Sequence, residues 1–240
     1  MKKTLIALTT FACFSNFAYA ETNELYLGGQ LGASIIKVKN IKDTLHYNHG
    51  GVINDGIFDS MHKTKLAGAL NLGYNFSNYD IPARVELSLT LRGNTDKKEN
   101  RYTDYEEYRL RTTQKVKARM NTLMLNGYYD IDIDSPITPF IGAGFGVAFT
   151  KLENSHKEKY NVSVDGSNYE RSLSKTKTKF AWNVAAGVAY KLNNNMVVDF
   201  TARYVDAGKV NIKKHNEYYR TNASAELSSI DLLAGVRYSF

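Results

Sequence analysis

The chain has 240 residues, with 31 Lys and Arg against 24 Asp and Glu, 17 Tyr, three Pro and one Cys. After the first twenty residues there is no run of about 18 apolar residues, which excludes a membrane-spanning helix. This composition suits either a soluble all-β domain or a β-barrel in a membrane. The periodicity of the apolar residues has to decide between them.

Residues 1–20 have the pattern of a cleaved signal peptide. Lys2 and Lys3 precede an apolar run, and Ala18-Tyr19-Ala20 has the small-x-small pattern of a cleavage site. We therefore expect a mature chain of residues 21–240 that forms a single domain. Loss of the two lysines lowers the net charge from +7 to +5.

The single cysteine, Cys13, lies within this segment and would be removed with it. The alternative is an acylated lipoprotein cysteine, but Thr10-Phe11-Ala12 before it makes a poor lipobox. A mature chain without cysteine fits export, because it has no thiol to misoxidise.

Eight segments of roughly ten residues alternate apolar and polar side chains, as strands of a membrane barrel do. In the last of them Leu233 is the only apolar residue on the polar face, and Phe240 ends the apolar face. An even number of strands lets an antiparallel sheet close with both ends on one side. The segments are 25–35, 65–76, 84–92, 122–131, 141–149, 179–191, 196–204 and 229–240.

Short and long connections between these segments alternate. Short turns on one side and long loops on the other are typical of an outer-membrane barrel, whose turns face the periplasm. A soluble sandwich has no reason to place a long loop at every second connection. The sequence therefore predicts that residues 21–240 form one outer-membrane β-barrel. The fold is all-β, an eight-stranded antiparallel transmembrane barrel with four long extracellular loops. The short connections are 77–82, 132–138 and 193–195, and the long ones are 39–62, 93–116, 150–178 and 207–225.

Aromatic residues gather at both ends of the predicted strands, as expected at the two interfaces between lipid and water. Next to the short turns lie Tyr74, Phe76, Tyr129, Phe140, Tyr190, Tyr238 and Phe240, and near the opposite rim lie Phe149, Phe180, Trp182 and Tyr204.

The predicted interior carries charges of both signs. With eight strands, the interior of a barrel is just filled by side chains, and a buried charge needs a partner. Matched depths predict two ion pairs, Asp199 with Arg237 and Arg203 with Asp231. We expect these charges to plug the interior rather than to line a conduction path. The other predicted interior charges are Arg84, Glu86 and Arg92.

Three short patterns could indicate a metal or phosphate site, and none is complete. His46-x-x-His49 has no further ligand beside it, and Asp130-x-Asp132-x-Asp134 has Ser135 where a calcium loop needs glycine. Gly142-x-Gly144-x-Gly146 keeps a period of two, so we expect these glycines to face inward beside Tyr128 and Met124. No catalytic constellation is visible, and we expect a protein that is not an enzyme and has no cofactor.

The long loops are rich in tyrosine and basic residues, which commonly anchor interfaces and attract sulfated glycans or lipopolysaccharide phosphates. In the third loop, Asp165-Gly166 predicts a hairpin that projects from the membrane. The alternative is a set of solvated loops that touch only lipopolysaccharide. The candidate ligand-binding residues are Tyr102, Tyr105, Tyr108, Arg109, Lys157, Lys159, Arg171, Lys175, Lys213 and Lys214.

Several stretches resemble the opacity (Opa) family of bacterial outer-membrane proteins. They are Glu107-Tyr108-Arg109 with Thr112 to Ala118, Tyr129-Asp130-Ile131-Asp132, Pro139-Phe140-Ile141-Gly142, Arg203-Tyr204 followed by Gly208-Lys209-Val210-Asn211, and the stretch from Glu226-Leu227 to Phe240. The resemblance covers most of the second half of the chain and is weaker in the first half. No receptor-binding motif of that family carries over to the loops here.

The resemblance implies an eight-stranded barrel whose surface loops mediate adhesion to host cells, through receptors of the carcinoembryonic-antigen type or heparan sulfate. We therefore expect a monomeric adhesin-like protein that contacts outer-membrane lipid and lipopolysaccharide and no nucleic acid. Tyr238 and Phe240 are expected to be recognised by the barrel assembly machinery. The alternatives are a small porin, a purely structural outer-membrane protein, or a lipid-modifying barrel enzyme.

Overall fold

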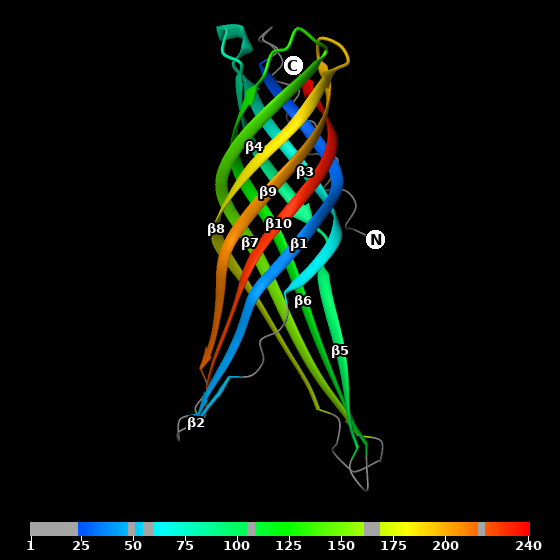
Figure 1. Cartoon of the computed structure of the whole chain (residues 1–240), viewed down its shortest axis with the longest axis vertical. Helices are drawn as coiled ribbons and strands as arrows, with labels where there is room; N and C mark the ends of the chain where they lie inside the picture. The colour runs from blue at the N-terminus through cyan, green and yellow to red at the C-terminus, as the bar shows by residue number, and fades with distance from the viewer. Residues whose placement is uncertain (1–23, 48–50, 55–59, 105–108, 161–168, 216–218) are drawn as a thin grey trace, which may run out of the picture.

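The computed structural model is a closed antiparallel β-barrel, and it describes residues 24–47, 51–54, 60–104, 109–160, 169–215 and 219–240 (Figure 1). Eight strands form the wall, and two further strands, β2 and β5, pair only beyond it. The strands are β1 (Leu25–Tyr47), β2 (Gly51–Asn54), β3 (Met61–Asn75), β4 (Ala83–Arg92), β5 (Thr95–Asp104), β6 (Arg109–Asp130), β7 (Ile137–Tyr160), β8 (Tyr169–Lys191), β9 (Met196–His215) and β10 (Tyr219–Ser239).

The barrel closes because the first strand pairs with the last. The sheet runs β10-β9-β8-β7-β6-β4-β3-β1, and β1 pairs with β10 from Tyr26 opposite Ser239 upward. The eight expected strand segments, the closure and the three short turns are confirmed. In the part of the chain that the structure describes, no helix is long and apolar enough to cross a membrane. The predicted signal peptide lies outside the described residues and stays a prediction.

The two faces of each strand differ as the alternation predicts. Leu31 is 69% exposed and Leu66 is 74% exposed, whereas the next residue along β3, Ala67, is buried. Apolar side chains that face outward are stable only against lipid, so this face of the wall is the membrane-spanning belt.

Aromatic side chains mark both ends of this belt. Beside the short turns, the rings of Tyr238 and Phe240 pack edge to face with centroids 5.2 Å apart, and at the opposite end Trp182 packs against Tyr204 at 5.8 Å. Phe140 was expected in the lipid-facing band, and this was wrong. Its ring is buried inside the barrel, because residue 140 has the inward parity of β7.

The segments expected to be long loops are for the most part strand. β7 has 24 residues and β8 has 23, which is more than twice the roughly 9–11 residues that cross a membrane. Both faces of these upper parts are polar because both face water, and alternation therefore fails to reveal them. The predicted Asp165-Gly166 turn lies outside the described residues, although β7 and β8 pair as far as Glu158 opposite Tyr169.

Above the belt the barrel wall separates into two extensions, seen at the bottom of Figure 1. β8 pairs with β9 only as far as Trp182 and Asp206, and β4 pairs with β6 only as far as Thr90 and Thr122. Beyond these points β9, β10, β1 and β2 stay paired, and we call this sheet arm I. β5, β6, β7 and β8 likewise stay paired, and we call this sheet arm II.

Glycines on β7 make room for large side chains in the interior. A Cβ atom added at Gly142 would overlap the ring of Tyr128 and the carbonyl oxygen of Gly127. The ring of Tyr128 in turn packs edge to face on Phe140, with centroids 5.6 Å apart.

We expect Gly142→Leu to destabilise the barrel, because overpacking a filled interior costs about 1–3 kcal/mol. The matched control is Ala143→Leu on the same strand, which points outward into lipid. Urea unfolding in detergent micelles, and the folded fraction on an unheated gel, measure the effect. Equal stability and folded fraction for the two variants would contradict the packing described here.

Candidate functional site

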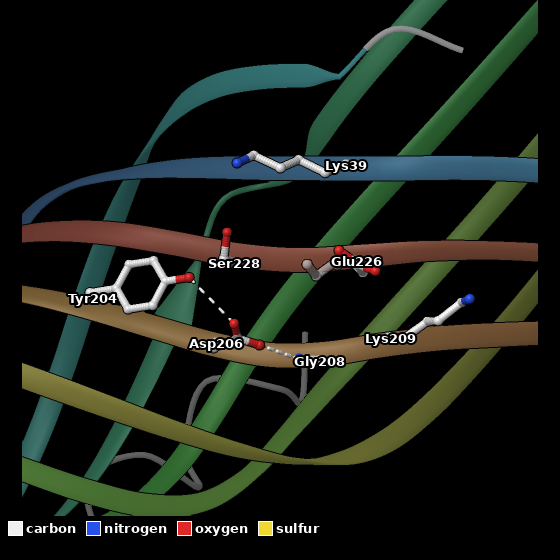
Figure 2. Close-up of a pocket in the computed structure, with 8 residues that line it drawn as sticks. Lys39, Tyr204, Asp206, Gly208, Lys209, Glu226 and Ser228 are labelled. Carbon is white, nitrogen blue, oxygen red and sulfur yellow. Dashed lines mark hydrogen bonds between the residues drawn. The ribbon is translucent and has the colours of Figure 1, made fainter. Parts of the chain in front are cut away.

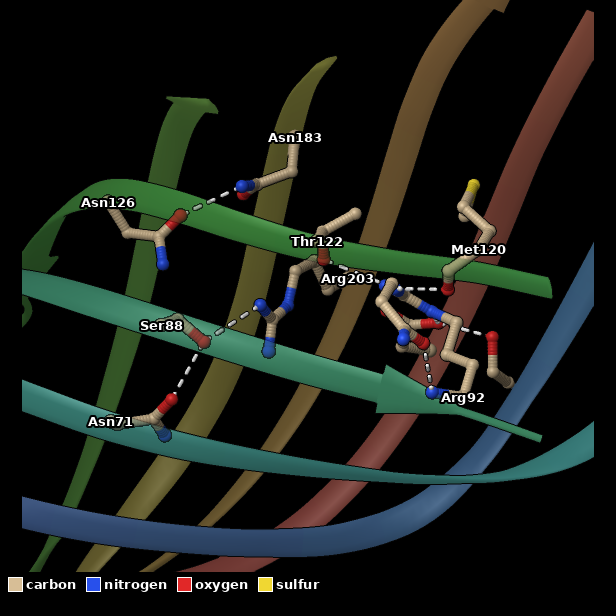
Figure 3. A network of polar contacts seen from close by, with 11 residues as sticks. Asn71, Ser88, Arg92, Met120, Thr122, Asn126, Asn183 and Arg203 are labelled. Atoms are coloured by element: carbon tan, nitrogen blue, oxygen red, sulfur yellow. Dashed lines mark hydrogen bonds and ion pairs between the residues drawn. The ribbon is translucent and has the colours of Figure 1, made fainter. Parts of the chain in front are cut away.

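The interior of the barrel is crossed by an ion pair between two distant strands. The guanidinium of Arg92 on β4 donates two hydrogen bonds to the carboxylate of Asp231 on β10, Nε to Oδ1 at 3.1 Å and Nη2 to Oδ2 at 2.5 Å (Figure 3). Ser34 Oγ on β1 donates a further bond of 2.6 Å to Asp231 Oδ1. Arg92 Nη1 also reaches Thr122 Oγ1 at 3.1 Å, so four strands are connected through one charge pair.

Arg203 was expected to form an ion pair with Asp231, and this was wrong, because Asp231 pairs with Arg92. The backbone register does place Arg203 opposite Asp231, as their matched depths predict. The fully buried Arg203 side chain instead reaches β4, where Nη1 lies 3.4 Å from Ser88 Oγ (Figure 3). Ser88 Oγ in turn donates to Asn71 Oδ1 at 2.7 Å.

Asp199 and Arg237 are brought together on β9 and β10. Arg237 Nε donates to Asp199 Oδ2 at 3.0 Å, and both side chains are buried. The other carboxylate oxygen accepts a bond of 2.6 Å from Gln30 Nε2 on β1. These three strands therefore share one polar cluster next to the point where the barrel closes.

Arg84 and Glu86 lie near the periplasmic end and take different partners. Arg84 Nε lies 3.3 Å from Asp130 Oδ1, and its guanidinium stacks over the rings of Tyr128 and Phe140 at 4.4 and 4.5 Å. Glu86 accepts a hydrogen bond of 3.0 Å from the Tyr26 hydroxyl. The aromatic rings thus fill this end of the interior and hold both charges.

The opposite end of the interior is closed by apolar side chains, a feature that the alternation did not single out. Inward parity alone does not say whether an interior layer is polar or apolar. We call these residues the apolar plug. They are Ile36, Val38, Met120, Met124, Ala148, Ala181, Ala207 and Leu227.

Six of the ten loop candidates lie on described strands of arm II, which brings together what the sequence places in separate loops. Tyr102 is opposite Arg111, and Arg111 is opposite Lys159, so these three positions share one row across β5, β6 and β7. Tyr105 and Tyr108 lie outside the described residues, and Lys213 and Lys214 lie on β9 in arm I. The six are Tyr102, Arg109, Lys157, Lys159, Arg171 and Lys175.

A shallow hollow of about 370 Å³ lies on the outside of arm I, at its base (Figure 2). Here β9 contains a bulge at Gly208, whose φ of 65° is a conformation that glycine adopts without strain. Asp206 Oδ1 accepts the Gly208 N–H at 2.7 Å, and Asp206 Oδ2 accepts the Tyr204 hydroxyl at 3.3 Å. Lys39 and Lys209 are both opposite Glu226 in the register. With Asp206, the hollow has two carboxylates against two lysines, so its charges are balanced.

No cluster of three metal-ligating side chains occurs among the described residues. His46 lies on β1, within a stretch whose side chains are not described, and His49 lies outside the described part of the chain. Asp132 and Asp134 lie in the turn between β6 and β7, where Asp132 Oδ1 accepts the N–H of Asp134 at 3.2 Å.

We expect Arg92→Ala to lower the free energy of unfolding by about 3–5 kcal/mol, because it leaves Asp231 buried without its cation. The double variant Arg92→Met with Asp231→Leu should lose less than either single change. Urea unfolding in micelles, followed by the fluorescence of Trp182, measures both. Lys191→Ala, at an exposed position, serves as the control and should stay within about 0.5 kcal/mol of the unmodified protein. Additive losses in the double variant would contradict a direct coupling of the pair.

Comparison with known proteins agrees with this architecture. The outer membrane protein PagN of Salmonella typhimurium is 31% identical over 222 residues, which cover 90% of both chains. A putative adhesin of Rickettsia rickettsii is 27% identical over 248 residues, which cover 99% of both chains. The crystal structure of the outer membrane protein OprG from Pseudomonas aeruginosa shares the fold, with a TM-score of 0.50 and 14% identity over 90% of this chain and 96% of that one.

The family defined by the outer membrane protein beta-barrel domain matches residues 4–240, almost the whole chain. This agrees with the opacity-type resemblance of the sequence, with the belt of outward apolar side chains and with the two aromatic bands. The protein belongs to the outer membrane beta-barrel family and is an opacity-type barrel of the bacterial outer membrane, with its long extensions at the cell surface.

Proposed function

We propose that this protein is a surface adhesin that binds host receptors or sulfated glycans through arm II. The observation that carries the proposal is that tyrosine and basic residues from two long connections, 93–116 and 150–178, lie on one paired sheet. Tyr102, Arg111 and Lys159 share a row of that sheet, and Lys157 lies two residues from Lys159 on the same strand. The basic residues of this row suit a ligand with repeated negative charges. Tyr and Arg are also frequent anchors of interfaces.

The length of the arms supports a role in binding. Strands β7 and β8 continue for more than ten residues beyond what a membrane crossing needs, and they remain paired there. A paired sheet loses less conformational entropy on binding than a flexible loop does, which favours affinity. The relative from Rickettsia rickettsii is itself named a putative adhesin.

We propose binding rather than catalysis or conduction as the role of the chain, with a monomer as the acting unit. Against the small-porin alternative stands the interior, where buried charged clusters and the apolar plug lie at successive levels of the barrel. In planar lipid bilayers we expect the purified barrel to show no stable large conductance. Stable openings comparable to those of a general porin would contradict the filled interior.

For adhesion, we expect the protein to make a non-adherent bacterium bind epithelial cells, and soluble heparin to reduce that binding. Replacing Lys157, Lys159, Arg171 and Lys175 with Gln should lower adhesion at least fivefold, because the charges of arm II are removed. The measurement is the count of bound bacteria at equal surface expression.

The matched control removes four positive charges from arm I instead, at Lys39, Lys42, Lys209 and Arg220. This variant should bind cells as well as the unmodified protein does. Equal losses in both variants would show that only net charge matters, and no adhesion by the unmodified protein would reject the proposal.

A further inference from the structure

Three cations and one carboxylate form a cluster on the outer wall of the barrel, on β6 and β7. Arg119 is opposite Lys151, and one row above, Lys117 is opposite Glu153. All four side chains are accessible, since Arg119 and Lys151 are exposed and Lys117 and Glu153 are half-buried. We call these four residues the rim cluster.

The rim cluster lies on the lipid side of the wall and at the extracellular end of the belt. Its residues have the same odd parity as Phe145 and Phe149 on β7, which are exposed and face lipid. Lys151 is two residues beyond Phe149, a distance of about 7 Å along the strand. On the neighbouring strand, Phe180 is opposite Val147 and is 66% exposed. The cluster therefore lies directly above a surface of aromatic side chains.

The positive charges of the rim cluster are only partly balanced. Lys151 Nζ lies 2.7 Å from Glu153 Oε1, and Lys117 Nζ lies 3.8 Å from Glu153 Oε2. The hydrogen bond from Lys151 lowers the pKa of the Glu153 carboxyl, which is therefore ionised at neutral pH. Arg119 Nε donates to the neutral Asn94 Oδ1 at 2.6 Å. Asp96 on β5 is also opposite Lys117, but its carboxylate pairs with Lys65 at 3.7 Å. Arg119 and Lys151 therefore have Glu153 as the carboxylate of their own cluster.

This arrangement favours an anion held between the two strands. Like charges directly opposite each other on one face of a sheet are destabilising, and Arg119 and Lys151 are such a pair. An anionic group between them removes that repulsion and engages the remaining guanidinium donors of Arg119. Arginine and lysine together are well suited to phosphate, which accepts several charge-assisted hydrogen bonds.

We propose that the rim cluster binds a phosphate group of a phosphorylated lipid in the outer leaflet, as lipopolysaccharide carries. The acyl chains of that lipid would lie along Phe149 and Phe180, and its phosphate would reach Arg119 and Lys151. The height of the cluster selects a lipid over a soluble glycan, which would meet the arms farther from the membrane. The hollow at the base of arm I holds two lysines and two carboxylates, so its charges are balanced and it carries no comparable site. The inference does not depend on the proposed adhesion.

The test compares two double variants of the purified barrel in detergent micelles. Arg119→Gln with Lys151→Gln removes the opposed pair, and Lys177→Gln with Lys179→Gln removes two cations from β8 at similar height. These two lysines have the inward parity of Ala181 and Asn183, so they do not face lipid. The probes are lipopolysaccharide, lipopolysaccharide with its lipid A phosphates removed, and soluble heparin. The measurement is the rise in unfolding temperature as each probe is added.

We expect lipopolysaccharide to raise the unfolding temperature of the unmodified barrel and of the β8 variant alike. The rim variant should bind it on the order of tenfold more weakly, because each cation beside an anionic lipid surface strengthens binding severalfold. The dephosphorylated lipid should stabilise all three proteins equally. An unchanged affinity of the rim variant would overturn the proposal. A heparin effect that equals that of lipopolysaccharide and is lost in the rim variant would also overturn it, since the cluster would then be a general anion surface.

Discussion

The backbone pairing of β1 with β10 is the constraint on which the rest of this structure depends. In lipid, an unpaired peptide group costs several kcal/mol, so a sheet can cross the membrane only if it has no free edge. Closure with eight strands then fixes how much room the interior has. The large Tyr128 ring fits because Gly142 faces it, and the Arg92 and Asp231 charges are tolerated because they meet each other.

That constraint ends where the lipid ends. Above the outer aromatic band the peptide groups can bond to water, and the sheet no longer has to be closed. The wall accordingly separates between β8 and β9 and above β4, and the two arms continue as separate sheets. A single strand therefore lies in lipid over its lower part and in water over its upper part. The lower half of β7 is selected for contact with lipid and with the interior, and its upper half for contact with whatever approaches the cell.

Much of the wall could be predicted from the sequence, because alternation reports directly which side chains face lipid. The depth of Asp199 and Arg237 follows from counting residues along neighbouring strands, and these two residues do contact each other. The partner of Asp231 could not be found in that way, since Arg92 reaches it across the barrel from β4. The inward position of Phe140 also follows from alternation, since the lipid-facing residues of β7 have odd numbers. Its place at the end of the strand instead suggested the aromatic band.

The arms escaped prediction for a different physical reason. In water both faces of a sheet are polar, and the period of two disappears although the backbone pairing continues. The richness of the long connections in tyrosine and basic residues still indicated the candidate ligand-binding residues. Only the register of β5, β6 and β7 shows that Tyr102 and Lys159 lie in one row.

The separation of the wall also changes how neighbouring copies of this protein meet. Where β8 leaves β9 above Trp182, it becomes the border of arm II within the described strands, and a border strand can recruit a strand from another molecule. Lys175, Lys177 and Lys179 lie along that stretch of β8, and lysine on a border strand opposes such recruitment through charge. Crowded barrels in one membrane can therefore keep their arms apart, so that each arm stays available at the cell surface.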